Sequence, residues 1–125
     1  MNHLRYGKEK SYRDDSMKSR VVFANRKLKA SFGKLYDFPN ENELLLKWLN
    51  DAFDKLAENA FCGVQIKKKL IPSVYIESYE IDNLWKLNLP KGWRLLYSVA
   101  RDEIRIISII LDWFDHKSYE KMLRY

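Results

Sequence analysis

The sequence predicts one small α+β domain. With 125 residues, of which 46% are hydrophobic and 14% aromatic, the chain has the size and composition of a single folded domain. Its apolar pattern begins with a short strand-like run, continues with a helical period and ends with three further strand-like runs. This order predicts an N-terminal strand, two helices on one face of a sheet, an antiparallel three-strand meander and a short C-terminal helix.

The first half of the chain is predicted to hold an arm, a strand and two helices. Residues 1–19 are polar and lack periodicity, so we expect a mobile basic arm before a single domain over 20–125. The run RVVFAN at 20–25 predicts a strand. Apolar residues spaced three and four apart predict a helix over 26–36 and a longer helix over 43–59.

The middle of the chain has no clear period. Residues 64–70 (VQIKKKL) are short and basic, and Pro72 closes them. The tyrosines of 73–82 suit either a loop that crosses the sheet or an extra strand, and both alternatives stay open.

Three strands are predicted in the second half. Residues 84–89 alternate between apolar and polar side chains, PKG at 90–92 makes a turn, and 93–100 forms the next strand. The third strand, 103–113, is almost continuously apolar, which predicts a place inside the sheet with both faces buried. Residues 115–124 predict a short basic helix or tail.

The turn predicts which side chains of the first hairpin share a face. If Leu89 faces Trp93, then Asn88 faces Arg94, and Lys86 lies on the same side as both. These three polar residues would form a basic patch on the open face of the sheet, while the opposite, apolar face joins the core. Neighbours across strands lie close enough to act on one phosphate.

Charge and cysteine content limit the classes of function. The net charge of +6 favours a polyanionic partner such as nucleic acid, although a merely basic surface explains it equally well. The single cysteine, Cys62, allows no internal disulfide and suits the reducing cytosol. Arg105 and Asp112 interrupt the longest apolar run, and Met1 opens a polar stretch. We therefore expect a cytoplasmic protein with neither a membrane span nor a secretory signal.

The common catalytic signatures do not occur in the sequence. It has no Ser-His-Asp arrangement, no Gly-rich phosphate loop and no zinc motif, so we expect neither a metal nor a cofactor. Basic residues, tyrosines and His116 suffice for RNA cleavage by the RNA's own 2′-hydroxyl. That reaction needs a base, an acid, and a cation for the phosphoryl charge; imidazole and guanidinium suit these tasks.

Four consecutive segments resemble the RelE/ParE toxin superfamily: LWKLNL at 84–89, GWRLLY at 92–97, the isoleucine-rich run after it, and DHKSY at 115–119. Those toxins carry a Lys-bearing strand, a Gly-aromatic-Arg-(hydrophobic)₂-Tyr strand, a hydrophobic last strand and a His/Arg-to-Tyr segment. The resemblance covers about 20–125, with the helices matched in pattern only. It implies a RelE-like mRNA interferase of a type II toxin–antitoxin system, which cleaves mRNA on the ribosome without a metal.

The resemblance implies four catalytic residues. Arg94 matches the arginine that contacts the scissile phosphate, and Lys86 matches a basic residue of the preceding strand if the turn is one residue shorter here. His116 lies where the family often has histidine or arginine, and Tyr119 matches a C-terminal tyrosine. Two features depart from the family pattern: the lysine-rich strand is reduced to Lys86, and an arginine at the end of the last strand is replaced by DWF at 112–114.

Six further residues are candidates for RNA contact, five of them lysines that suit phosphate contacts or an ordinary solvated face. The sixth is a tryptophan that could stack on an unpaired base. They are Lys67, Lys68, Lys69, Lys91, Lys117 and Trp113. The partners implied by the resemblance are mRNA, the ribosome and an antitoxin protein, whose contacting segment would be acidic or amphipathic.

Two alternatives to the nuclease remain open. A ParE-like toxin binds DNA gyrase and cuts no RNA, so it needs no acid–base group, and His116 and Tyr119 argue against it. The other alternative is a non-catalytic member of the same fold that binds nucleic acid or protein.

Overall fold

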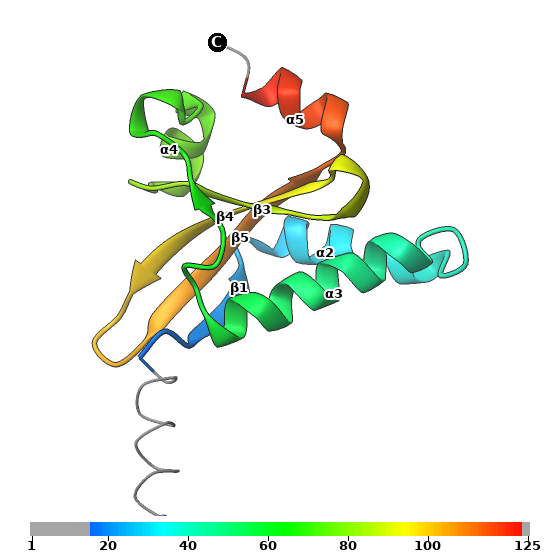
Figure 1. Cartoon of the computed structure of the whole chain (residues 1–125), viewed down its shortest axis with the longest axis horizontal. Coiled ribbons are helices and arrows are strands. Elements are labelled where there is room, and N and C mark those ends of the chain that lie inside the picture. Colours follow the sequence, from blue (N-terminus) through cyan, green and yellow to red (C-terminus); the bar gives the residue numbers. More distant parts are fainter. Residues whose placement is uncertain (1–15, 124–125) are drawn as a thin grey trace, which may run out of the picture.

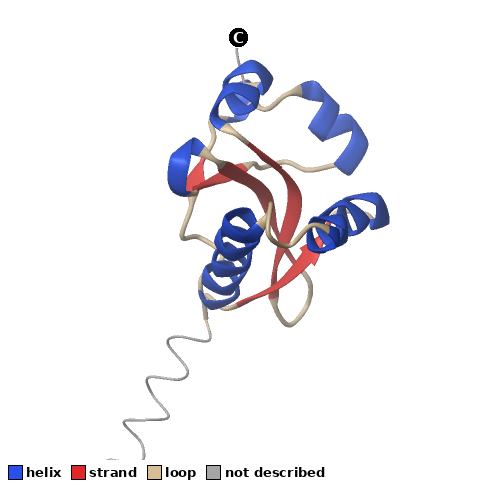
Figure 2. Ribbon diagram, turned by 90° about the vertical axis from the view of Figure 1, so that its right-hand side faces the viewer, coloured by secondary structure: helices blue, strands red, loops and turns tan. Residues whose placement is uncertain are grey.

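The computed structural model describes residues 16–123, which form a five-stranded mixed sheet with helices on both faces (Figures 1 and 2). β1 is parallel to β5, and the other neighbouring strands are antiparallel. The α+β class is confirmed, and the sheet has one strand beyond the predicted set. In spatial order the strands are β1 (Ser19–Phe23), β5 (Ile106–Phe114), β4 (Arg94–Arg101), β3 (Trp85–Asn88) and the added β2 (Val64–Gln65).

The helices lie in two pairs on opposite sides of the sheet (Figure 2). α2 (Arg26–Lys34) and α3 (Glu43–Glu58) pack on one face, as the sequence predicts. α4 (Ser73–Tyr79) and α5 (His116–Met122) pack on the other face. The prediction of helices on one face only is therefore wrong, and 73–79 is a helix instead of a loop or an extra strand.

Local sequence signals explain where the helices begin. The Asn25 side chain accepts a hydrogen bond from the Leu28 amide at 2.8 Å, and so caps α2. Asp115 caps α5 in the same way, through the Ser118 amide at 2.8 Å. The longer helix α3 is held by its apolar stripe, whose buried members are Leu46, Leu49, Ala52 and Leu56.

The core under α2 and α3 contains the apolar face of the predicted hairpin. Leu95 and Tyr97 of β4 are fully buried there, and Trp85 of β3 stacks on Tyr97 with ring centroids 6.1 Å apart. The predicted core face is thereby confirmed. Other buried members of this cluster are Leu49, Ala52, Leu56, Leu89 and Ile110.

The predicted register of the hairpin is confirmed. Asn88 is paired with Arg94, and the Leu89 amide donates to the Trp93 carbonyl at 2.9 Å. Lys86 therefore shares a face with Arg94, as expected. That face is not open, however. The face also contains Leu96 and other apolar side chains, which must be buried. Helices α4 and α5 therefore cover this face of the sheet.

β5 lies inside the sheet between β1 and β4, as its apolar run predicts. Its pairing with β4 contains a bulge: Leu96 faces Asp112 and Tyr97 faces Ile110, so Leu111 is the extra residue. The bulge turns two successive β5 side chains toward the α4/α5 face. As a result, the Asp112 carboxylate is half-buried in the strand.

The start of the described chain is tied to the end of α3. The Met17 carbonyl accepts from the Ala60 amide at 3.0 Å, and the Ser19 hydroxyl donates to the Leu56 carbonyl at 2.7 Å. The last residues of the predicted 1–19 arm are thus attached to the domain. Residues 1–15, the rest of that arm, lie outside the described residues, as do 124–125.

Candidate functional site

A cluster of two cations and one aromatic ring lies on the α4/α5 face. The Lys86 ammonium is 5.6 Å from the centre of the Tyr119 ring, and the Arg94 guanidinium carbon is 5.5 Å from it. Both distances are within the range of cation–π attraction. Strands β3 and β4 and helix α5 thus bring three of the four predicted catalytic residues together. We call Lys86, Arg94 and Tyr119 the basic cluster.

Arg94 offers a donor that the described protein does not use. Its Nη1 donates to the Trp93 carbonyl at 3.0 Å, whereas its Nε is buried without a hydrogen-bond partner among the described residues. A buried unpaired donor costs about 1–3 kcal/mol. An anionic oxygen that reached this nitrogen would relieve that cost, and phosphoryl oxygens match the planar geometry of guanidinium.

Lys86 is half-buried in the middle of β3. It is paired with Val64 of β2 on one side and with Leu96 of β4 on the other. The aliphatic stem of a half-buried lysine can cover apolar neighbours while its ammonium group stays near solvent.

His116, the fourth predicted residue, lies at the start of α5 against the turn that precedes Arg94. A methyl group on Gly92 would lie 2.8 Å from the His116 Cβ, and Gly92 has a φ of +81°, which favours glycine. The glycine of the GWRLLY segment therefore lets α5 approach the hairpin. Hydrogen bonds from the Ser118 amide and hydroxyl hold the pKa of the capping Asp115 below its usual value.

The imidazole of His116 is paired on its own helix. Its Nε2 lies 2.5 Å from the Glu120 carboxylate, and both side chains are more than half exposed. An exposed pair adds little stability, but it orients the ring at the edge of the basic cluster.

Two titratable groups on the same face were not predicted as site residues. Burial raises the pKa of Asp112, whose carboxylate accepts from the Trp113 amide at 2.9 Å. The hydroxyl of Tyr75 in α4 is buried without a hydrogen-bond partner among the described residues. Its pKa is raised mainly by burial, and to a smaller extent by the negative charge of Asp112 nearby. The sequence drew attention to Asp112, because DWF at 112–114 replaces an arginine of the family pattern. Nothing in the sequence of α4 pointed to Tyr75.

The five candidate lysines fall into two places. Lys91 lies in the turn beside Gly92, and Lys117 follows His116 in α5; both side chains are exposed. The run Lys67, Lys68 and Lys69 is exposed on the connection from β2 to α4, at the edge of the sheet.

Trp113 lies on the other face of the sheet. Its ring makes an edge contact with Phe32 of α2, with centroids 6.2 Å apart at 82°, inside the α2/α3 core. The prediction that it stacks on RNA beside the basic residues is therefore corrected. Strand alternation places Trp113 and Arg94 on opposite faces of the sheet. The prediction relied on the closeness of Trp113 to basic residues in the sequence, which does not indicate the face.

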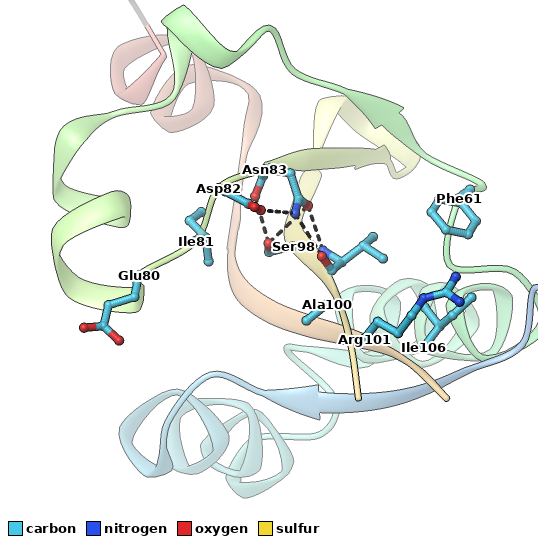
Figure 3. A pocket seen from close by; sticks show the side chains of 10 residues that line it. Phe61, Glu80, Ile81, Asp82, Asn83, Ser98, Ala100, Arg101 and Ile106 are labelled. Atoms are coloured by element: carbon cyan, nitrogen blue, oxygen red, sulfur yellow. Dashed lines mark hydrogen bonds between the residues drawn. The ribbon is translucent and has the colours of Figure 1, made fainter. Parts of the chain in front are cut away.

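A hollow of about 520 Å³ lies at the far end of β4 (Figure 3). The Asn83 side chain forms its floor by bonding both main-chain groups of Val99 at 2.8 and 2.9 Å, and the Ser98 hydroxyl donates to the Asn83 carbonyl at 2.8 Å. Figure 3 shows Glu80 and Arg101 on opposite sides of this hollow. Arg101 is about 23 Å along the strand from Arg94, so the hollow is separate from the basic cluster.

Residues 16–123 contain no group of three or more His, Cys, Asp or Glu side chains that could hold a metal ion. None of the helices in that range has both the length and the apolar character needed to cross a bilayer.

Comparison with known proteins finds no relatives. No model of a known family matches the chain, and neither a curated protein nor a solved structure matches it significantly. The resemblance to the RelE/ParE superfamily therefore stays a prediction from the quoted segments.

Proposed function

We propose that the protein is a metal-independent endoribonuclease, the toxin of a type II toxin–antitoxin system, and that it cleaves mRNA on the ribosome in the cytoplasm. One observation carries this proposal. Lys86 and Arg94 from neighbouring strands meet at the Tyr119 ring, with His116 held beside them by the Gly92 contact. The quoted sequence segments supply the choice of RNA and ribosome.

In the proposed reaction the RNA supplies its own nucleophile. The 2′-hydroxyl attacks the adjacent phosphorus, the bond to the 5′-oxygen breaks, and the products carry a 2′,3′-cyclic phosphate and a 5′-hydroxyl. The Tyr119 phenolate takes the proton of the 2′-hydroxyl and becomes a phenol, and the His116 imidazolium gives a proton to the leaving 5′-oxygen. Arg94 and Lys86 bind the phosphoryl oxygens, which carry the most negative charge in the transition state.

The cations around the cluster suit a polyanionic partner. Lys91 lies in the turn before Arg94, Lys117 lies in α5, and Lys67, Lys68 and Lys69 add charge at the sheet edge. We propose that these five lysines contact RNA phosphates. The same charge would attract the acidic or amphipathic segment of an antitoxin that covers Arg94.

The test is mRNA integrity in a translating extract supplied with the purified protein. Primer extension should map cuts inside translated codons, and a 2′-deoxynucleotide at the cut position should abolish cleavage because it removes the nucleophile. The same mRNA without ribosomes should stay intact. Intact mRNA in the translating extract would contradict the proposal, and inhibition of gyrase supercoiling instead would favour the ParE-like alternative.

A second candidate is a protein of the same fold that holds a phosphate backbone without cutting it. The observation in its favour is the pairing of His116 with Glu120, which occupies Nε2 on its own helix. A labelled RNA that binds in an Arg94-dependent way, yet is never cleaved in the extract, would support this candidate over the nuclease.

A further inference from the structure

A second basic surface lies along the edge strand β1. The structure has a hollow of about 500 Å³ there, formed by the strand and the start of α2. β1 pairs with β5 on one side, and no other described strand pairs with its outer side. The residues that line the hollow are Arg20, Val21, Val22, Phe23, Asn25, Arg26 and Lys29. We call this hollow the β1 groove.

Every charged residue that lines the β1 groove is basic. Arg20, Arg26 and Lys29 are exposed, and the groove is lined by no acidic side chain of the described residues. The adjoining helix α2 (RKLKASFGK) also contains no acidic residue. A partner at this surface would therefore carry negative charge.

The groove also presents main-chain groups. The Ala24 amide donates to the Ile110 carbonyl at 2.8 Å, so Ala24 faces β5. Main-chain groups in a strand turn to alternate edges, and Val21 and Phe23 therefore present their N–H and C=O groups to the outer side. Such an edge is a template for one more strand.

We infer that the β1 groove binds an extended acidic peptide of a partner protein, which adds to β1 as a sixth strand. Main-chain bonds to Val21 and Phe23 would give affinity, and acidic side chains facing Arg26 and Lys29 of α2 would give specificity. β5 and β4 separate this edge from the Lys86 strand, so the inference does not depend on the proposed nuclease.

The other possible occupants fit less well. In a second copy of this chain, pairing β1 with β1 would bring two sets of Arg20, Arg26 and Lys29 together, and like charges at close range oppose association. An RNA backbone would match the cations, but it has no alternating donors and acceptors to pair with a strand edge.

The experiment uses the full chain and a fluorescein-labelled decapeptide of alternating valine and glutamate, followed by anisotropy. Arg26→Glu with Lys29→Glu should weaken binding by about tenfold or more, which corresponds to ~1.4 kcal/mol. Lys27→Glu with Lys34→Glu is the matched control, because it makes the same charge change on α2 outside the groove. It should weaken binding by no more than about threefold, as a long-range electrostatic effect.

A second peptide tests the strand pairing itself. N-methylation of alternate residues keeps every charge and removes the main-chain donors, so this peptide should bind at least about tenfold more weakly. Equal binding of the two peptides would overturn the inference. A uridine decamer that displaces the peptide, and itself loses binding through Arg26→Glu with Lys29→Glu, would assign the groove to RNA and would also overturn it.

Discussion

At the scale of single residues, Gly92 links the hairpin to the C-terminal helix. It has a φ of +81°, and a methyl group there would lie 2.8 Å from the His116 Cβ. Backbone geometry and close contact therefore both require glycine at the position that opens the GWRLLY segment. The placement of His116 beside the basic cluster depends on this residue.

Replacing Gly92 by alanine should lower the free energy of unfolding by about 1–2 kcal/mol, since a side chain in the left-handed region is strained. Gly33→Ala is the control, because Gly33 is in helix α2 with no atom within 4 Å of its would-be Cβ. That change should raise the free energy of unfolding by about 0.5–1 kcal/mol. Urea denaturation measures both, and equal effects would contradict the assigned role of Gly92.

The half-buried Asp112 gives a prediction with a defined pH dependence. Burial raises its pKa in the folded state, so the folded protein binds the proton more tightly than the unfolded chain. Stability contributed by Asp112 therefore falls as pH rises through that raised pKa. Asp112→Asn keeps an oxygen for the Trp113 amide, and its melting temperature should exceed that of the wild type at pH 7 more than at pH 3.

Asp102→Asn should show the opposite dependence. Hydrogen bonds from the Ile104 and Arg105 amides lower the pKa of this exposed carboxylate, so its stabilisation is present above the ordinary pKa and is lost as pH falls. The variant should therefore melt below the wild type at pH 7 and approach it in acid. A pH-independent difference for both substitutions would refute the assigned causes.

At the scale of elements, α5 depends on its cap. The Asp115 carboxylate accepts from the Ser118 amide at 2.8 Å, and α5 carries both His116 and Tyr119. Asp115→Ala should speed amide hydrogen exchange throughout α5, whereas Asp115→Asn should change it little, because asparagine caps a helix about as well. Equal exchange in the two variants would show that packing alone holds the helix.

Tyr97 connects β4 to the chain that follows α3. Its hydroxyl donates to the Ala60 carbonyl at 2.9 Å and accepts from the Gly63 amide at 3.1 Å. Tyr97→Phe would leave both buried groups unpaired, so it should lower the free energy of unfolding by about 1–3 kcal/mol. RNA cleavage by the folded fraction should not change, because Tyr97 faces the core opposite Arg94; a loss of cleavage would place this tyrosine in the site instead.

At the scale of the whole molecule, the sequence predicted what depends on strand alternation and short turns. The pairing of Asn88 with Arg94 and the two faces of the hairpin followed from one turn and the alternation around it. The place of β5 inside the sheet followed from its apolar run. These are local rules, so a single sequence suffices to apply them.

The sequence could not predict what depends on distant packing. Residues 73–79 are too short to show a helical period, so the cover over the second face of the sheet was missed. The bulge at Leu111 shifts the register of β5. After the bulge, Trp113 pairs with Leu95 and faces the α2/α3 core. His116 and Glu120 are spaced four residues apart, as neighbours on a helix are, so their pairing depends on residues 116–122 forming the helix α5.

The most direct test of the basic cluster is the single-turnover rate of mRNA cleavage on translating ribosomes, measured for Arg94→Ala and Arg101→Ala. Both substitutions remove an arginine from β4, but Arg101 is exposed at the far end of the strand. Loss of a transition-state contact predicts a rate about 10²–10³ lower for Arg94→Ala, with Arg101→Ala close to the wild type. Equal rates for all three proteins, or cleavage by none, would contradict the assignment of Arg94 to the scissile phosphate.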